Sequence, residues 1–245
     1  MSKIYRALEQ ARQELTEPES DAGAGWRMPV RKDTLLPPQR QGSRVSAEHN
    51  AYIEICRAFE TQLALHSKKT VQVICSRRGE GVSTVVKGIA LTSAERLGKR
   101  VLIIDTSSRY PEWVMAGGQR PHGGPVPVST CFKAGRENLC VAFLPLDAAA
   151  IWLSPVQSGR DILAELSDYF DLILIDSPSF EESPDGIDLA RHADGVIIVV
   201  EAERTKWFLV DNLKEKILNN EGRLLGVVLN KRRFHIPEPV YRWFH

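Results

Sequence analysis

Six short apolar runs recur between residues 71 and 229, and stretches with helical character separate them. The runs are rich in β-branched residues and lack polar-apolar alternation, which is typical of strands buried on both faces of a parallel sheet. They cover residues 71–75, 101–105, 141–144, 172–176, 196–200 and 225–229. Residues 84–97 repeat apolar positions on one helical face before Gly98, and residues 206–219 predict another helix before Gly222. The pattern predicts an α/β fold with a doubly wound, mostly parallel sheet.

The remaining sequence forms appendages of a single domain. Residues 1–15 place apolar side chains at intervals of four, three and four, which predicts an amphipathic N-terminal helix. Residues 16–47 are rich in proline and glycine and poor in apolar side chains, as in a flexible linker. The domain then covers residues 48–230, and an aromatic and basic tail follows at residues 231–245. The basic residues of the linker are either solvated or attracted to an anionic membrane, and the tail either covers its own sheet or binds a membrane or a partner.

The charge and cysteine content exclude several function classes. The 245 residues include 32 Lys and Arg against 31 Asp and Glu, so the net charge of +1 gives no general attraction to nucleic acid. The four cysteines lack the spacing of a metal site and are predicted to be core thiols in a reducing compartment. No apolar run approaches the roughly 18 residues that span a bilayer, and the N-terminus does not resemble a signal peptide. We therefore expect a cytoplasmic protein that does not bind nucleic acid.

A glycine-containing loop at residues 75–84 joins the first of these strands to the next helix. In this strand-loop-helix context backbone N–H groups converge on phosphate, and Gly79 and Gly81 let the backbone approach the anion. Ser83 stands where a hydroxyl would ligate magnesium, but Val82 stands where a lysine would contact the β- and γ-phosphates. The alternative interpretation is a tight glycine turn in a protein that binds no nucleotide.

Four sequence motifs, in order, resemble those of the bacterial tyrosine autokinases (BY-kinases) of exopolysaccharide assembly, which are relatives of the MinD/ParA ATPases. Residues 79–84 read GEGVST and are similar to the family's PGEGKST phosphate loop. Residues 98–111 read GKRVLIIDTSSRYP and resemble GKRVLLIDADLRRP, while residues 171–178 read DLILIDSP and resemble the Walker B strand DLVIIDTPP. Residues 225–230 read LGVVLN and are similar to the family's GVVLN. The resemblance covers residues 48–230 and implies a P-loop NTPase fold of the MinD/ParA type.

The resemblance also implies a set of site residues. The nucleotide-binding candidates are Arg77, Gly79, Glu80, Gly81, Ser83, Thr84 and Asn230, the last at the position that contacts adenine in the family. The magnesium candidates are Ser83, Asp105 and Asp176, and the two aspartates are also the catalytic candidates if the protein is active. The implied cofactor is ATP or ADP with Mg²⁺.

The chain departs from the family pattern at residues that act on the transferring phosphoryl group. Val82 replaces the lysine and Ser107 replaces a second aspartate, and each lost electrostatic partner typically contributes about 3 kcal/mol. Arg77 stands where MinD-type loops carry an additional lysine, and its guanidinium could grip phosphate instead. Arg77 and Arg78, which replaces the family's proline, could equally be exposed loop charges. We therefore predict an impaired catalyst that keeps the nucleotide-binding fold.

The contacts by which the family assembles into rings are changed as well. The ExxRxxR helix motif of the kinases corresponds here to Glu54, Arg57 and Glu60, so an acid replaces the last arginine. A like-charge contact would stand in place of an Arg–carboxylate pair between subunits, which counts against the ring and leaves other self-association open. The family's C-terminal tyrosine cluster is reduced to Tyr241.

These features favour a catalytically impaired, tyrosine-kinase-like P-loop protein that regulates exopolysaccharide or capsule polymerisation or export. The resemblance implies a partner, an inner-membrane polysaccharide co-polymerase that regulates chain length or another export component, and hence a peripheral position at the inner membrane. One alternative is an active autokinase or ATPase in which Arg77 compensates for the missing lysine. Another is a MinD/ParA-like positioning factor that dimerises with nucleotide.

Overall fold

The structure, a computed structural model, describes the domain with several gaps. The described residues are 30–31, 44–64, 69–106, 131–136, 138–144, 146 and 162–232. The predicted N-terminal helix, most of the predicted linker and tail, Ser107 and Tyr241 lie outside them.

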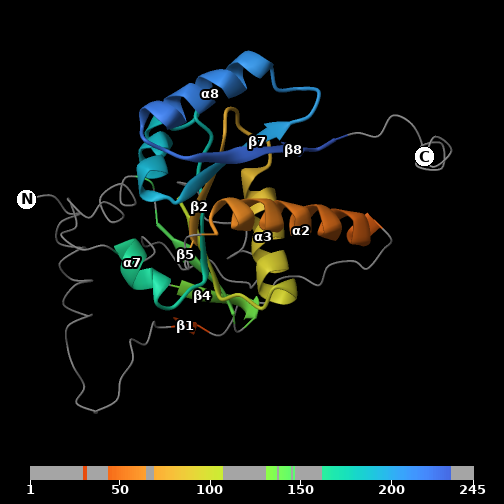
Figure 1. The fold of residues 1–245 in the computed structure, drawn as a ribbon, viewed down its shortest axis with the longest axis vertical. Coiled ribbons are helices and arrows are strands. Elements are labelled where there is room, and N and C mark those ends of the chain that lie inside the picture. The colour runs from red at the N-terminus through yellow and green to blue at the C-terminus, as the bar shows by residue number, and fades with distance from the viewer. Residues whose placement is uncertain are drawn as a thin grey trace, which may run out of the picture.

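One eight-stranded sheet, in the order β1-β4-β5-β3-β6-β2-β7-β8, forms the centre of the described part (Figure 1). Six strands run parallel: β2 (Lys69–Cys75), β3 (Val101–Asp105), β5 (Leu139–Phe143), β6 (Leu172–Asp176), β7 (Gly195–Glu201) and β8 (Leu224–Asn230). β4 (Cys131–Arg136) is antiparallel to β5, and the two-residue β1 (Val30–Arg31) pairs with β4. The six predicted strands and the mostly parallel sheet are confirmed, whereas β1 and β4 were not predicted.

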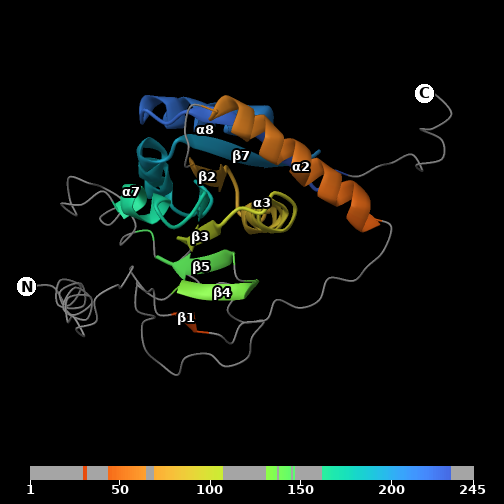
Figure 2. The same cartoon turned by 60° about the horizontal axis from the view of Figure 1, so that its bottom comes forward.

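Helices cover both faces of this sheet, and Figure 2 shows α3 and α7 on opposite sides of the stacked strands. α2 (Arg44–Gln62) and α3 (Val82–Arg96) contribute to the core on one face. α7 (Ile162–Ser167), the 3₁₀ helix η1 (Pro184–His192) and α8 (Trp207–Asn219) contribute to two clusters on the other face. The predicted doubly wound arrangement is therefore present.

Burial on both faces explains why the strands are apolar throughout. In β3, Val101 and Ile103 belong to the core under α2 and α3, while Leu102 and Ile104 belong to the cluster on the opposite face. All five residues of the strand are buried, and the last of them is Asp105. A polar side chain thus appears only where the strand reaches the edge of the sheet.

The order of the strands places a crevice at their carboxyl ends. β6 lies between β2 and β3, so the chain leaves β2 toward one side of the sheet and later passes from β6 to β7 on the other side of β2. Where connections diverge in this way, an open α/β sheet leaves a crevice that can bind a ligand. Cys75, Asp105 and Asp176 end the three strands at this crevice.

Helix α2 carries the residues that correspond to the family's ring motif. It begins at Arg44, four residues before the domain boundary that we expected at residue 48. Glu54 and Arg57 are exposed, but Glu60 forms an ion pair with Lys99 of the same chain, and these two side chains are 27% and 22% exposed. The acid at residue 60 therefore has a partner within its own subunit.

Three of the four cysteines are buried free thiols, as predicted: Cys56, Cys75 and Cys140. Burial raises the pKa of the Cys56 and Cys75 thiols, so both stay protonated at neutral pH. The side chain of Cys131 lies outside the described part of the structure.

Several large apolar side chains are exposed on α8 and β8. Trp207 is 78% exposed, and Phe208, Val227 and Leu229 are each about half exposed. None of the helices that the structure describes is both long enough and apolar enough to cross a bilayer.

Candidate functional site

The loop between β2 and α3 presents a helix N-terminus to the crevice. The N-cap of α3 is Gly81, which provides no side-chain hydrogen bond to the first turn. The first N–H groups of a helix have no intrahelical acceptor and can therefore bind an anion. Gly79 and Gly81 have φ angles of 86° and 98°, which glycine adopts without strain. The loop thus has the backbone shape of a phosphate-binding turn.

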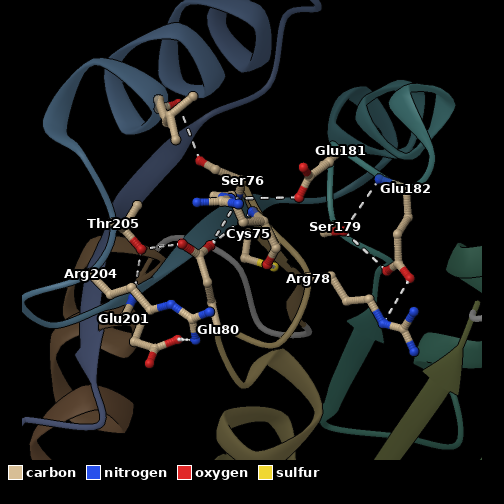
Figure 3. Close-up of polar contacts among 12 residues, drawn as sticks. Cys75, Ser76, Arg78, Glu80, Ser179, Glu181, Glu182, Glu201, Arg204 and Thr205 are labelled. Carbon is tan, nitrogen blue, oxygen red and sulfur yellow. Dashed lines mark hydrogen bonds and ion pairs between the residues drawn. The ribbon is translucent and has the colours of Figure 1, made fainter.

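Glu80 anchors this loop to the rest of the domain (Figure 3). Its buried carboxylate accepts hydrogen bonds from the N–H groups of Ser76 and Arg77, at 3.0 and 3.1 Å, and from a side-chain hydroxyl. That hydroxyl belongs to Thr205, which precedes α8. Asn230 Nδ2 donates to the Glu80 carbonyl oxygen at 2.9 Å. Glu80 and Asn230, both nucleotide candidates from the sequence, therefore make internal contacts that fix the loop.

Replacing Gly81 with alanine is expected to lower the free energy of unfolding by about 3 kcal/mol. An added Cβ would lie 2.2 Å from Asn230 Nδ2, and a φ of 98° is strained for any other residue. Gly79→Ala is the matched control, because its φ is also positive but its Cβ would meet nothing within 4 Å. Gly79→Ala should lower the free energy of unfolding by only about 1–2 kcal/mol. Urea unfolding measures the free energy of unfolding of both variants. Equal losses of stability would contradict a steric conflict between the added Cβ of residue 81 and Asn230.

Two aspartates meet at the carboxyl ends of β3 and β6. Asp105 and Asp176 are paired in the register of these strands, and each is 3% exposed. Ser83, in the first turn of α3, lies close enough to the side chain of Asp176 to lower its pKa, and Asp176 Oδ2 has no partner within the described residues. Thr106 donates its N–H and its hydroxyl to the Asp176 carbonyl oxygen, at 3.0 and 2.8 Å. The structure thus brings the three magnesium candidates from the sequence together.

The carboxylate of Asp176 is buried next to that of Asp105. Burial and then the charge of Asp105 raise the pKa of Asp176 to about 8, and the nearby Ser83 side chain opposes them only in part. A hydroxyl beside two carboxylates is an oxygen donor set that Mg²⁺ accepts together with waters. Within the described residues, no group of three or more His, Cys, Asp or Glu side chains forms a metal site of another kind. The residues present therefore fit a hydrated magnesium ion.

A cavity of about 370 Å³ opens between the phosphate loop and the end of β6. The candidates from the sequence that line it are Gly79, Gly81, Ser83, Thr84 and Asp176. Val82 lines it too, yet is only 7% exposed, so an apolar surface stands at the position of the lysine. Arg77, Glu80, Asp105 and Asn230 are not among the described residues of the lining.

The arginine that reaches the cavity is Arg78, not the expected Arg77. Arg77 Nε lies 3.7 Å from Glu181 Oε2, and this pair is outside the cavity lining. Arg78 lines the cavity, and its Nε lies 3.3 Å from Glu182 Oε1 (Figure 3). Among the described lining residues, Arg78 is the one basic side chain. The sequence alone could not separate two adjacent loop arginines, because backbone dihedral angles decide which of them faces the crevice.

Polar residues directly after two strands also line the cavity, and sequence reasoning did not single them out. They are Thr106 after β3 and Ser177, Ser179 and Glu182 after β6. Ser177 accepts a hydrogen bond at 2.9 Å from the buried Gln72 of β2. The position of these residues in the sequence could have identified them, because the carboxyl ends of neighbouring parallel strands lie at the same edge of the sheet.

Comparison with curated proteins gives relatives among bacterial kinases and polysaccharide proteins, although no family model matches the chain. The chain is 27% identical over 195 residues to the tyrosine-protein kinase CpsD of Streptococcus agalactiae serotype III, covering 73% of the chain and 82% of CpsD. It is also 27% identical over 220 residues to the succinoglycan biosynthesis transport protein ExoP of Rhizobium meliloti. That alignment covers 81% of the chain and 27% of ExoP.

Comparison with solved structures supports the same assignment of the fold. The kinase domain of VpsO superposes with a TM-score of 0.60 at 22% identity, covering 78% of the chain and 98% of that kinase domain. The septum site-determining protein MinD of Pyrococcus horikoshii, complexed with Mg-ADP, gives a TM-score of 0.52 at 16% identity, covering 71% of the chain and 76% of MinD. The chain is therefore similar in sequence to bacterial tyrosine-protein kinases and has the fold of their kinase domains and of MinD-type P-loop ATPases.

Proposed function

We propose that this chain is a catalytically impaired, tyrosine-kinase-like P-loop protein that binds ATP or ADP with Mg²⁺ and regulates exopolysaccharide or capsule polymerisation or export. The observation that carries the proposal is that Ser83, Asp105 and Asp176 lie together while Val82 stands at the lysine position. Ser83, Asp105 and Asp176 would hold the ion, which when bound neutralises phosphate charge. The N–H groups that begin α3 would bind the phosphates.

The proposed loss of catalysis follows from the side chains at residues 82 and 107, which lack the charged groups needed for phosphoryl transfer. Val82 offers neither a charge nor a hydrogen bond to a phosphoryl group in transfer, and Ser107 has no carboxylate to manage a proton. Each loss is worth about 3 kcal/mol of transition-state stabilisation. Together they lower the rate by roughly 10⁴ if they are approximately additive. Binding depends on other groups and survives these losses.

The proposed partner is an inner-membrane polysaccharide co-polymerase, which would place the chain peripherally at that membrane. The names of two relatives support this: CpsD is a tyrosine-protein kinase, and ExoP is a succinoglycan biosynthesis transport protein. The chain aligns with 27% of ExoP, so the similarity covers a minor part of a longer transport protein.

Calorimetry with full-length protein tests the nucleotide half of this proposal. We expect ATP and ADP to bind only when Mg²⁺ is present, because the ion would neutralise the negative charge that the phosphates bring next to Asp105 and Asp176. Incubation with Mg²⁺ and labelled ATP should give no more phosphate release or phosphotyrosine than an Asp176→Ala control. Turnover well above that control would contradict the impairment.

Recovery of the full-length chain from membranes tests the partner half. Affinity purification from detergent-solubilised membranes of the native host should recover a polysaccharide co-polymerase or another export component. Recovery of no protein of polysaccharide assembly in repeated experiments would count against the regulatory function. That result would not count against the proposed nucleotide binding.

An active autokinase or ATPase is the second candidate, and one observation favours it. Arg78 places a guanidinium at the cavity that the sequence hypothesis had assigned to Arg77. A guanidinium can contact phosphate oxygens through two parallel hydrogen bonds, so it could replace part of the lysine's function. The turnover measurement above separates this candidate from the first. A MinD/ParA-like positioning factor would instead show nucleotide-dependent dimerisation, which a mass measurement with and without ATP detects.

A further inference from the structure

An arginine and a glutamate face each other across the lining of the cavity (Figure 3). Arg78 Nε lies 3.3 Å from Glu182 Oε1, and the two side chains are 59% and 37% exposed. Ser179 orients the carboxylate, because its hydroxyl donates to Glu182 Oε2 at 3.1 Å and accepts from the Glu182 N–H at 3.3 Å. All three residues line the cavity. The acid is therefore held in place, while the arginine is the more exposed partner.

The cavity contains independent signs of a charged ligand. Asp176 Oδ2 is buried without a partner within the described residues, and Asp176 lines the cavity. The uncapped N-terminus of α3 opens on the same space from the loop side. A ligand that satisfies both features carries negative oxygens together with a divalent cation, as a magnesium polyphosphate does.

Glu182 and such a ligand would compete for one guanidinium. Val82 supplies no cation, and Arg78 is the basic side chain within the described lining. A half-exposed ion pair is weak because water screens it, so a more highly charged anion can displace the carboxylate. Once displaced, Glu182 would add negative charge beside the phosphates and lower their affinity.

We propose that Arg78 is the phosphate-binding cation of this cavity, and that Glu182 is an internal competitor which holds Arg78 until a nucleotide polyphosphate arrives. This inference rests on the proposed nucleotide function and adds to it the residue that compensates for Val82. The affinity of the site is then set by the balance between an internal carboxylate and the phosphates of the ligand. Longer polyphosphates compete better, so ATP gains more from Arg78 than AMP does.

The matched control for this pair lies beside it in the sequence. Arg77 and Glu181 form an ion pair of the same type, at 3.7 Å and with 51% and 56% exposure, but neither lines the cavity. Glu181→Gln therefore removes the same charge on the same loop without touching the lining. Arg77→Ala tests the competing assignment that the sequence suggested.

Calorimetric titration of the full-length chain with Mg-ATP, at fixed ionic strength, decides whether Arg78 or Arg77 binds the phosphates. Arg78→Ala should weaken binding about tenfold, and Glu182→Gln should tighten it about threefold. The gain from Glu182→Gln should vanish in the Arg78→Ala background, while Glu181→Gln and Arg77→Ala stay within about twofold of wild type. The AMP affinity should change less than the ATP affinity in the Arg78 variant.

Other outcomes overturn the inference, and one of them also overturns the proposed nucleotide function. An Arg78→Ala loss no larger than that of Arg77→Ala removes Arg78 as the phosphate ligand. Weaker binding in Glu182→Gln makes the acid part of the binding site rather than its competitor. If wild type and Glu182→Gln both fail to bind ATP, ADP and inorganic triphosphate with Mg²⁺, nucleotide binding itself fails. Thermal unfolding of each variant confirms that these surface substitutions leave the fold intact.

Discussion

Val82→Lys is expected to tighten Mg-ATP binding by about 10- to 100-fold. Val82 is buried in the core but also borders the cavity, and a lysine side chain is long enough to extend from this position toward the phosphates. Charge-assisted hydrogen bonds of this type contribute about 1.5–3 kcal/mol. Adding Ser107→Asp should then raise phosphate release by at least 100-fold over wild type, since both lost transition-state partners return. Calorimetry and a phosphate-release assay provide the two measurements.

Val82→Met is the control for the lysine variant. Methionine also replaces the buried valine by a long flexible chain, but it brings no charge, so it should not tighten binding. A methionine variant that binds as tightly as the lysine variant would show that shape, not charge, limits the site. Equal turnover in wild type and the double variant would contradict the proposed impairment.

Asp176→Asn is expected to stabilise the protein without Mg²⁺ and to abolish stabilisation by the ion. Burial and the charge of Asp105 raise the pKa of Asp176 to about 8, whereas an unfolded aspartate ionises near 4. The folded state therefore holds a proton that the unfolded state releases, so stability falls as the pH rises from about 4 to 8. Asparagine removes this loss of stability, and the gain should be on the order of 5 kcal/mol at pH 9 and close to zero at pH 4. Urea unfolding at both pH values, with and without Mg²⁺, measures it.

Asp171→Asn serves as the control of opposite sign. Asp171 accepts a hydrogen bond at 2.6 Å from Arg100, and this contact lowers the pKa of the exposed carboxyl. Its stabilising contribution is present above the unfolded pKa and is lost on acidification, so Asp171→Asn should be slightly destabilising at neutral pH. If Asp176→Asn changed stability equally at pH 4 and 9, the buried-charge explanation would fail.

The sheet could be predicted because its strands are buried on both faces. That burial requires continuous apolar runs, as in β3 and β6, and such runs are visible without any structure. β4 escaped prediction because residues 131–136 read CFKAGR, which has neither a continuous apolar run nor a clean alternation. β1 has only two residues and depends on pairing with β4, so no local signal marks it.

The site was predictable where backbone position alone determines what a residue does. Ser83, Asp105 and Asp176 stand at a helix start and at two strand ends, so their meeting follows from the topology. The direction of a loop side chain does not follow in this way. Arg78 rather than Arg77 lines the cavity, and only the folded backbone of the loop fixes this choice.

Because Glu80 anchors the phosphate loop, the loop does not need a ligand to keep its shape. Because the Glu80 carboxylate satisfies the N–H groups of Ser76 and Arg77, the protein's own contacts hold the first half of the loop in place. The loop then loses little conformational entropy when a nucleotide binds. The fold also remains intact without any turnover of nucleotide. A lineage with such a loop can lose phosphoryl transfer by neutral drift at Val82 or Ser107 while its architecture persists for another use.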